Sequence, residues 1–354
     1  MRVLITGGAG FVGGTLSLGL AARHPDWELV ALDNLKRRGS ELNLPRLREA
    51  GVRFVHADVR ELADVLAVSS VDAVVECSAE PSALAGLGGE TDYVVRTNLL
   101  GAYHCLELAR RDAAQMVFLS TSRVYPVEAL NALRYVETEM RFELSAEQEL
   151  KGASERGISE RFPLDGARTL YGATKLAAEL LVAEYAAAFG LRTVIDRCGV
   201  IAGPWQMGKV DQGVFTHWML SHYFGRDLSY IGFGGRGKQV RDLVAIDDLV
   251  ELIDDQLARP EQWTGFVGNV GGGSEISLSL LETTEICREL TGNLVAIAAE
   301  DDTRPGDVPV YISDCTLLFD RTAWRPRQDA RAILGSIYTW IKNNERALRF
   351  ALGG

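Results

Sequence analysis

The sequence is poor in the residues that build disulfide frameworks and metal centres. It has only five histidines, and no arrangement of them suggests a metal site or a serine triad. Its five cysteines are an odd number and show no C-x-x-C spacing; they are Cys77, Cys105, Cys198, Cys287 and Cys315. We therefore expect buried free thiols in a reducing compartment and no bound metal ion.

Long apolar runs and an excess of positive charge are also missing. No apolar stretch approaches the ~20 residues of a membrane-spanning helix, and the N-terminus lacks the apolar region and cleavage site of a signal peptide. The formal net charge is −11, whereas proteins that bind nucleic acids usually carry a basic surface. We expect a cytoplasmic protein that binds neither membranes nor nucleic acids, and in which an anionic substrate needs locally placed arginines.

The first half of the chain alternates short apolar runs with helical patterns. Helical stretches such as 97–111 have apolar residues at three- and four-residue spacing. The strand-like runs are residues 3–5, 29–32, 52–55, 73–75, 116–119 and 192–195. This repetition predicts an α/β fold with a doubly wound parallel sheet of the Rossmann type.

The length of 354 residues allows a second, smaller α/β lobe. We expect a Rossmann domain at residues 1–196, with 236–256 returning to it, and a substrate-binding lobe at 197–354. The segment 126–168 is rich in Glu, Arg and Ser and predicts a long insertion of loops and short helices. Insertions of this length inside a compact domain are usually functional or disordered.

A glycine-rich turn follows the first predicted strand and opens a helix. Gly7, Gly10 and Gly13 have a G-x-x-G-x-x-G spacing, with Phe11 and Val12 between the last two. Such glycines permit a tight turn and let backbone amides approach a pyrophosphate at a helix N-terminus. A turn of this kind can also be glycine-rich for steric reasons alone, so its place after a strand gives the motif its weight. It predicts a dinucleotide site.

A carboxylate stands where it would select the dinucleotide. Asp33 lies 20 residues after Gly13 (33 − 13 = 20) at the end of the second predicted strand, where it would hold the adenosine ribose hydroxyls. Because it repels a ribose phosphate, NAD is expected rather than NADP, although the basic residues 36–38 could accommodate that phosphate. Asp58 and Val59 follow the third strand and are expected at the adenine, a helix cap being the other role open to the aspartate.

Tyr171 and Lys175 are candidate catalytic residues, because the Y-x-x-x-K spacing places them on one helical face. A neutral tyrosine, with a pKa of ~10, is a poor base at neutral pH. The Lys175 ammonium and the positive nicotinamide would both favour its phenolate. The spacing occurs by chance in many helices, but here it follows a dinucleotide-binding half and the hydroxyl triplet 120–122. Thr121 is expected to offer its hydroxyl to the oxygen being oxidised.

Together these motifs resemble the extended short-chain dehydrogenase/reductase family, over nearly the whole chain. Finer features are similar to its CDP-paratose 2-epimerase (CDP-tyvelose epimerase) branch: residues 33–35, 122–125, 137–139, 211–213, 237–242, 269–272 and 277–281. The resemblance implies the following cofactor-binding residues: Gly7, Gly10, Phe11, Val12, Gly13, Asp33, Asn34, Asp58, Val59, Ser78, Ala79, Asn98, Tyr171 and Lys175.

The resemblance also implies an activity. Bound NAD would remove a hydride from a ring carbon of a nucleotide-diphosphate sugar and return it to the other face of the keto-sugar. In the branch this is carbon 2 of a CDP-linked deoxyhexose, which favours CDP over UDP. A homodimer or higher homo-oligomer is implied by analogy. The residues by themselves indicate only hydride transfer at a sugar carbinol.

Substrate contacts are expected mainly in the second lobe. Arg241 and Arg304 match positions with which the family clamps a nucleotide diphosphate, since a guanidinium binds phosphate oxygens in pairs. Salt bridges to Asp242 and Asp307 are their alternative role. The other residues assigned to the substrate are Ser122, Arg123, Gln206, Asp211 and Gln212.

Departures from the branch leave alternatives open. Pro126 stands where the branch usually has glycine. After Arg197, residues 198–200 are Cys-Gly-Val, whereas the family usually has bulkier or polar residues there. A sugar 4,6-dehydratase would carry Asp-Glu after the active threonine and a decarboxylase Ser-Glu, whereas this chain has Ser122-Arg123. A UDP-sugar 4-epimerase needs the same catalytic residues and stays open, as does a non-catalytic NAD-sensing regulatory protein.

Overall fold

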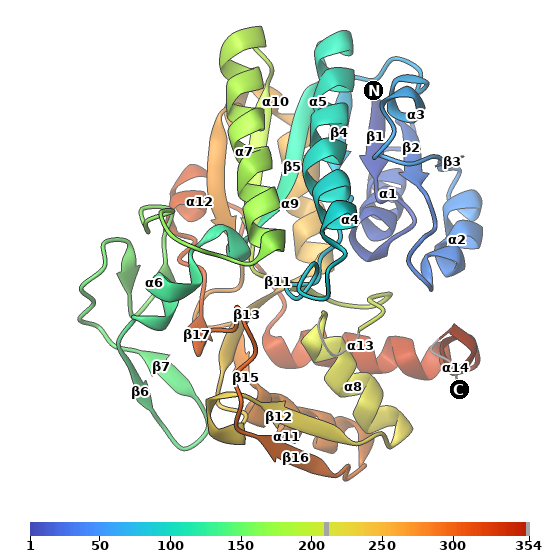
Figure 1. Ribbon diagram of the computed structural model, residues 1–354. Helices are drawn as coiled ribbons and strands as arrows, with labels where there is room; N and C mark the ends of the chain where they lie inside the picture. The colour runs from blue at the N-terminus through green and yellow to red at the C-terminus, as the bar shows by residue number, and fades with distance from the viewer. Residues whose placement is uncertain (209–211, 352–354) are drawn as a thin grey trace. The chain divides into compact units, whose positions relative to one another are not determined.

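Figure 1 shows a computed structural model of the chain, which describes residues 1–208 and 212–351. The chain divides into two compact units, each assembled from three separate segments. Unit 1 consists of Met1–Thr121, Leu170–Arg197 and Leu249–Val267. Unit 2 consists of Ser122–Thr169, Cys198–Asp248 and Gly268–Gly354.

Unit 1 is built on a seven-stranded sheet with the order β14-β10-β5-β4-β1-β2-β3. The ladders from β3 through β2, β1 and β4 to β5 are all parallel. The strands are β1 (Arg2–Thr6), β2 (Glu28–Asp33), β3 (Arg53–His56), β4 (Ala73–Glu76), β5 (Gln115–Thr121), β10 (Thr193–Cys198) and β14 (Phe266–Val270). The prediction of a doubly wound α/β fold is confirmed, and β14 is a strand that the apolar runs do not predict.

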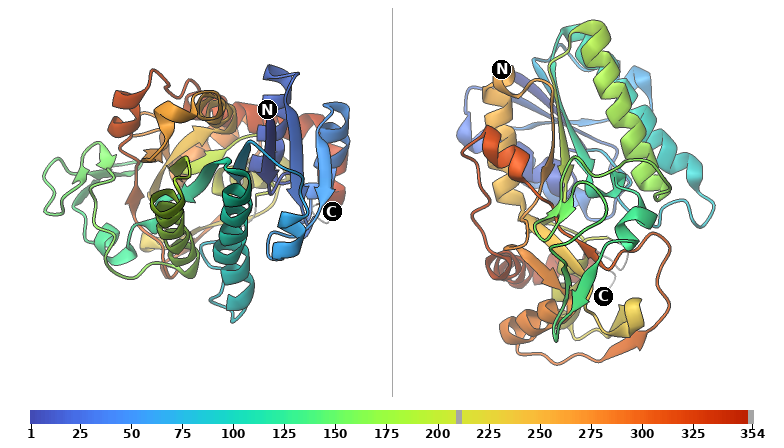
Figure 2. Two further views of the ribbon diagram at one scale, coloured as in Figure 1. Left: turned by 90° about the horizontal axis from the view of Figure 1, so that it is seen from above. Right: turned by 90° about the vertical axis from the view of Figure 1, so that its left-hand side faces the viewer.

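Helices cover both faces of this sheet, as the edge-on view in Figure 2 shows for α7 and α9. The helices are α1 (Phe11–Arg23), α2 (Leu44–Glu49), α3 (Leu62–Leu66), α4 (Thr91–Val95), α5 (Gly101–Asp112), α7 (Leu170–Phe189), α9 (Ile246–Ala258) and α10 (Pro260–Trp263). A π-helical turn, Arg96–Leu100, joins α4 to α5. On one face, Leu106 of α5 and Val182 of α7 share a buried core with Leu4 and Val74 of the strands.

Unit 2 combines a mixed four-stranded sheet with several short pairs of strands. In the four-stranded sheet β13 pairs in parallel with β11 and β17 and antiparallel with β15. The other pairs are β6 with β7, β8 with β9, and β12 with β16. The strands are β6 (Tyr135–Glu137), β7 (Phe142–Leu144), β8 (Ala153–Ser154), β9 (Gly157–Ile158), β11 (Val200–Ala202), β12 (Leu228–Ile231), β13 (Val240–Ala245), β15 (Ser277–Ser279), β16 (Ile297–Glu300) and β17 (Val310–Tyr311).

The helices of unit 2 enclose its core. They are α6 (Val127–Asn131), α8 (Val214–Phe224), α11 (Leu280–Thr291), α12 (Thr316–Arg321), α13 (Ala330–Asn343) and α14 (Glu345–Ala351). Buried Trp218 of α8, Cys287 of α11 and Ile337 of α13 belong to one apolar cluster. The segment 126–168 consists of α6 and the pairs β6–β7 and β8–β9, and it packs within unit 2. None of the helices in the described ranges is long and apolar enough to span a membrane.

Candidate active site

The turn between β1 and α1 requires glycine at several positions. Gly7 has a φ of 60°, in the left-handed region, and its carbonyl accepts a 2.9 Å hydrogen bond from the Gly10 amide. A Cβ atom on Gly13 would lie 2.3 Å from the Gly7 oxygen, and one on Gly8 would lie 2.6 Å from the Cβ of Ala31. Side chains are therefore excluded where the turn packs against the first turn of α1 and against β2.

The start of α1 fits the pyrophosphate of a dinucleotide. Its N-cap is Gly10, whose lack of a side chain leaves no cap hydrogen bond, and the first turn contains no acidic residue. The 13-residue helix begins at Phe11, followed by Val12. The N-terminal amides and the positive end of the helix dipole thus meet no competing side-chain anion from this turn.

Asp33 connects the end of β2 to the glycine turn. Its carboxylate accepts hydrogen bonds from the backbone amides of Ala9, at 3.1 Å, and of Leu35, at 2.7 Å. Burial raises the pKa of Asp33, and these backbone donors oppose the shift. The residue expected at the adenosine ribose therefore lies in contact with the turn expected at the pyrophosphate.

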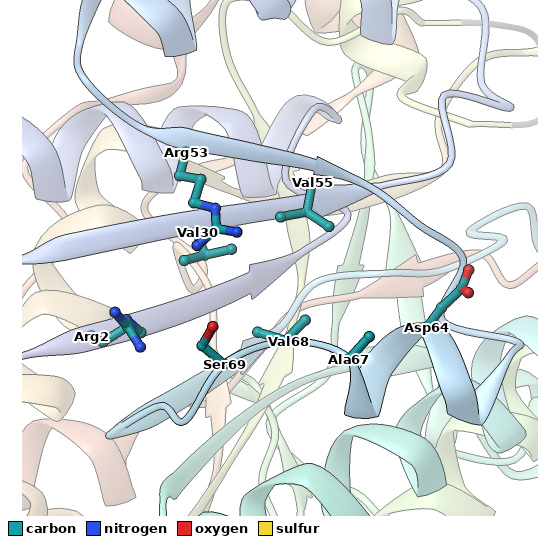
Figure 3. A pocket seen from close by; sticks show the side chains of 8 residues that line it. All are labelled: Arg2, Val30, Arg53, Val55, Asp64, Ala67, Val68 and Ser69. Carbon is teal, nitrogen blue, oxygen red and sulfur yellow. The ribbon is translucent and has the colours of Figure 1, made fainter.

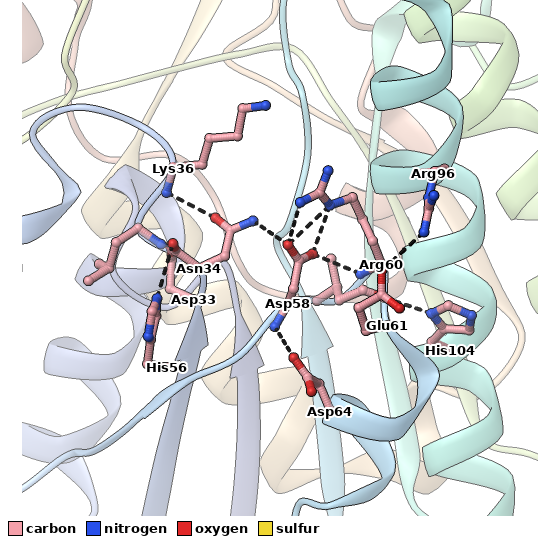
Figure 4. A network of polar contacts seen from close by, with 12 residues as sticks. Asp33, Asn34, Lys36, His56, Asp58, Arg60, Glu61, Asp64, Arg96 and His104 are labelled. Carbon is pink, nitrogen blue, oxygen red and sulfur yellow. Dashed lines mark hydrogen bonds and ion pairs between the residues drawn. The ribbon is translucent and has the colours of Figure 1, made fainter.

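A polar network joins the ends of β2 and β3 (Figure 4). The Asn34 amide donates to the Asp58 carboxylate at 3.0 Å, and Arg60 donates to the same carboxylate at 2.6 Å. Burial alone would raise the pKa of Asp58, but the bonds from Arg60 and Asn34 outweigh it and hold that pKa well below its ordinary value. Lys36 lies 3.6 Å above the centre of the Tyr93 ring. The carboxylate expected at the adenine is thus fixed and ionised.

Asn98 holds together the segments that would flank the nicotinamide. It is fully buried in the π-helical turn. Its side chain accepts a hydrogen bond from the Glu80 amide at 2.8 Å and donates one to the Glu80 carbonyl at 3.2 Å. It also donates to the Thr174 hydroxyl of α7 at 3.2 Å. The loop with Ser78 and Ala79 is therefore tied to α7. Val59 is likewise buried at the end of its loop.

The three candidate catalytic residues come from two adjacent elements. Thr121 is the last residue of β5 and Tyr171 the second residue of α7, which packs against β5. The Lys175 ammonium lies 4.0 Å from the centre of the Phe118 ring in the same strand. Farther along α7, Glu179 accepts a 2.5 Å hydrogen bond from the Ser120 hydroxyl. These contacts fix the helix on the strand.

Glu76 is absent from the residues that the motifs predict. It ends β4, and its Oε2 atom lies 3.3 Å from the Lys175 Nζ atom, with side chains 0% and 2% exposed. Burial raises the pKa of Glu76, while the Lys175 charge acts in the opposite direction. The only signal available in the sequence is a charged residue that closes an otherwise apolar strand.

In unit 2, the arginines expected at the substrate gather around one turn. Arg241 donates to the Asp307 carboxylate at 2.5 Å and to the Val308 carbonyl at 2.7 Å. Arg123 donates to the Gly306 carbonyl at 2.7 Å. In the same turn the Arg304 carbonyl accepts a hydrogen bond from the Asp307 amide at 3.1 Å. Burial lowers the pKa of Arg241 to about 10, and the neighbouring Arg123 charge acts in the same direction.

The remaining candidates of unit 2 are more dispersed. Gln206 is buried and bonds the Ile201 carbonyl and the Thr216 hydroxyl, so its side chain is occupied within the unit. Ser122 is half-buried and begins a 3₁₀ turn after β5. Gln212 is half-buried just before α8. Asp211 lies outside the described residues.

A metal-binding cluster and the hollow shown in Figure 3 are two other features that could mark a functional site. No group of three or more His, Cys, Asp and Glu side chains that could hold a metal ion occurs in the part of the chain that the structure describes. The hollow is lined by none of the candidate residues; its lining residues are Arg2, Val30, Arg53, Val55, Asp64, Ala67, Val68 and Ser69. The candidate residues of unit 1 lie instead around the glycine turn, the ends of β2 to β5 and the start of α7.

Comparison with known proteins gives matches over almost the full length. The chain is 29% identical to CDP-paratose 2-epimerase of Salmonella typhi, over 97% of this chain and 100% of that protein. It is 26% identical to dTDP-glucose 4,6-dehydratase of Mycobacterium tuberculosis strain CDC 1551 / Oshkosh, over 98% and 94%. The crystal structure of Thermus thermophilus UDP-glucose 4-epimerase in complex with NAD matches with a TM-score of 0.75 and 25% identity, over 97% and 99% of the two chains.

These relatives act on nucleotide-linked sugars. Residues 3–271 match the NAD dependent epimerase/dehydratase family. The predicted cofactor, NAD, and the predicted enzyme class agree with that family. The chain therefore belongs to the NAD-dependent epimerase/dehydratase family and is an enzyme that uses NAD.

Proposed function

We propose that the protein epimerises carbon 2 of a CDP-linked hexose. The observation that carries the reaction is the group formed by Thr121, Tyr171 and Lys175, in the unit that also contains the glycine turn. A hydroxyl, a phenol and a buried ammonium are the groups needed to take a proton from a sugar hydroxyl and return it. CDP and carbon 2 rest on the branch motifs and on the full-length match to the Salmonella typhi enzyme.

The chain's own residues would divide the work as follows. Bound NAD supplies hydride acceptance from, and return to, the carbinol carbon. Thr121 orients the hydroxyl of that carbon, and Tyr171 takes its proton. Lys175 stabilises the tyrosinate by its positive charge. Because an epimerisation ends in the redox state in which it began, Tyr171 can return the same proton after the sugar has exposed its other face.

The arginines around the turn 304–308 would bind the diphosphate. Arg241 and Arg123 bring two guanidinium groups to this turn, where Asp307 bonds Arg241 and the adjacent Asp242 also lies close to it. Arginine is suited to this role because its planar fork bonds phosphate oxygens in pairs. In a strongly acidic protein, a nucleotide diphosphate needs such locally placed arginines, and Arg304 of the same turn is the third candidate.

Alanine at Arg241 or Arg304 is expected to raise the Michaelis constant more than it lowers turnover, because the diphosphate lies away from the reacting carbon. Steady-state kinetics with the CDP-sugar give both constants. Arg331→Ala is the matched control, since Arg331 also belongs to unit 2 and forms an exposed pair with Glu289. An unchanged Michaelis constant in both test variants would leave these arginines as structural ion pairs.

Isotopic labelling tests the reacting carbon. Substrate deuterated at carbon 2 should keep its label in the epimerised product, because the hydrogen is stored within the enzyme and returned. It should also react more slowly than unlabelled substrate where that transfer limits the rate. Nuclear magnetic resonance of the product gives both the label and the stereochemistry. Loss of the label to water would contradict direct return.

The second candidate is a UDP-sugar 4-epimerase. It is favoured by the 25% identity to the Thermus thermophilus enzyme over nearly the whole chain and by the same minimal catalytic set. The same experiment separates the two, since a 4-epimerase shows its isotope effect with deuterium at carbon 4. A panel of CDP- and UDP-sugars identifies the nucleotide. The Ser122-Arg123 pair argues against the 4,6-dehydratase reaction, for which Asp-Glu is expected at these positions.

A further inference from the structure

The Lys175 ammonium is buried with one charged neighbour of opposite sign. Its Nζ atom lies 3.3 Å from Glu76 Oε2, and both side chains are almost completely shielded from water. Its other close contact is the face of the Phe118 ring. Removing an ammonium from water is costly, and without an anion it releases its proton more readily. Glu76 therefore supplies the charge that allows Lys175 to be both buried and positive.

The position of this carboxylate is set by the sheet. Glu76 on β4 and Phe118 on β5 are direct partners in the parallel ladder, so both side chains lie on the face that α7 covers. Lys175 reaches them from α7. Its aliphatic chain and ammonium are thus held by two adjacent strands, and no second carboxylate bonds Nζ among the residues that the structure describes.

The nearby thiols stay neutral, and the next buried carboxylate on α7, Glu179, is paired with Arg197 at 2.7 Å. Burial raises the pKa of the Cys77 thiol on the β4 side and of the Cys105 thiol on α5, and the Glu76 charge acts in the same direction. From β1 the nearest polar group is the Thr6 hydroxyl, which bonds the Cys77 amide. From α7, Tyr171 shares the helical face of Lys175. Glu179 already has its own counter-ion in Arg197, so Glu76 is the carboxylate that bonds Lys175 here.

We infer that Glu76 is a positioning residue: its carboxylate holds Lys175 in place and keeps its ammonium protonated, so that this charge can act on Tyr171. The inference rests on the proposed roles of Tyr171 and Lys175. Glu76 itself touches neither sugar nor cofactor in this scheme. It bonds one of the three N–H groups of the ammonium and leaves two for other partners.

The test follows the ionisation of Lys175 directly. NAD-loaded protein carrying ¹³C at the lysine Cε atoms is titrated by nuclear magnetic resonance. The chain has only six lysines, and Lys175→Arg identifies the signal. In Glu76→Gln the midpoint of this signal should fall by at least about one pH unit, since the buried ammonium has lost its counter-ion. Glu76→Asp keeps the charge and should lower the midpoint by less.

Asp196→Asn is the matched control. Asp196 is an equally buried carboxylate of unit 1 whose Oδ1 atom accepts a hydrogen bond from Gln256. Its replacement should leave the Lys175 midpoint and turnover unchanged. Turnover of the CDP-sugar across pH is the second readout, and its alkaline limb should move down in Glu76→Gln by the same interval as the midpoint. Glu76→Asp provides the comparison if the Gln variant folds poorly.

The two proposals fail in different ways. A Lys175 midpoint that is the same in wild type, Glu76→Gln and Glu76→Asp would overturn the inference, whatever the activity. A wild-type protein that leaves every CDP-sugar unchanged would overturn the proposed function, while the titration would still decide the role of Glu76. A shifted midpoint together with a shifted alkaline limb supports both.

Discussion

Replacing Tyr171 by phenylalanine should lower turnover by at least about 100-fold, the low end of the contribution of a positioned acid or base. The change removes one oxygen atom and with it the group that exchanges a proton with the sugar. Because the ring remains, NAD binding and the packing of α7 should persist. Initial rates with the CDP-sugar and the NAD content of the purified protein check the two statements separately.

Tyr185→Phe is the matched control for this experiment. Tyr185 belongs to the same helix, and its hydroxyl bonds Glu107 of α5 at 2.6 Å. Loss of that bond costs a contact between helices and removes no proposed proton carrier. A Tyr171→Phe enzyme that works about as fast as the Tyr185→Phe enzyme would remove Tyr171 from the mechanism.

Replacing Lys175 by methionine should inactivate the enzyme and lower its free energy of unfolding. Breaking a buried ion pair by removing one partner typically costs about 3–5 kcal/mol, because the other charge stays buried without compensation. Here the residue left behind is Glu76, which is fully buried. Denaturant unfolding at neutral pH measures the loss, provided that the slope with denaturant is unchanged.

The loss should depend on pH with a definite sign. Burial already raises the pKa of Glu76 against the Lys175 charge, and removing that charge raises it further. A carboxyl group whose pKa is higher in the folded than in the unfolded state adds stability below the unfolded value of about 4.3 and loses it as the pH rises through the folded value. The deficit of Lys175→Met should therefore be largest at neutral and alkaline pH and should shrink in acid.

Glu76→Gln combined with Lys175→Met tests the cause. The double variant leaves no unpaired buried charge, so it should recover most of the stability lost in Lys175→Met. It should stay inactive because the ammonium is missing. A double variant as unstable as Lys175→Met would show that the loss comes from packing around the methionine and not from charge.

The parts of the fold that can be predicted from the sequence are those that depend on a short stretch of neighbouring residues. Strands buried on both faces appear as continuous apolar runs, which is why β4 and β5 are predicted within a few residues of their ends. Strand β14 escapes this criterion because Gly268 and Asn269 interrupt it. Asn269 is buried nevertheless, since Tyr125 and Ile158 satisfy its side chain at 2.8 Å each. Those partners lie far away in sequence and cannot be inferred from the strand.

The candidate site follows the same division. The glycine turn and Asp33 are recognisable because their spacing encodes backbone geometry. The Glu76–Lys175 pair joins residues 99 positions apart, and its register depends on the ladder between β4 and β5. Arg241 makes the same point, since its carboxylate partner is Asp307 and not the adjacent Asp242. Long-range pairing of charged groups is decided by packing, which no local pattern specifies.

The borders of the two units have a consequence for how such a chain can diversify. Thr121 is the last residue of one segment of unit 1, and Tyr171 is the second residue of the next, so the intervening chain, Ser122–Thr169, belongs wholly to unit 2. Insertions, deletions and exchanges in that stretch change unit 2 while its two ends stay anchored in β5 and α7. Under the proposed function, the proton-transfer residues and the stretch that would help to bind the sugar nucleotide therefore belong to different units, so the second can change in sequence while the first keeps its place.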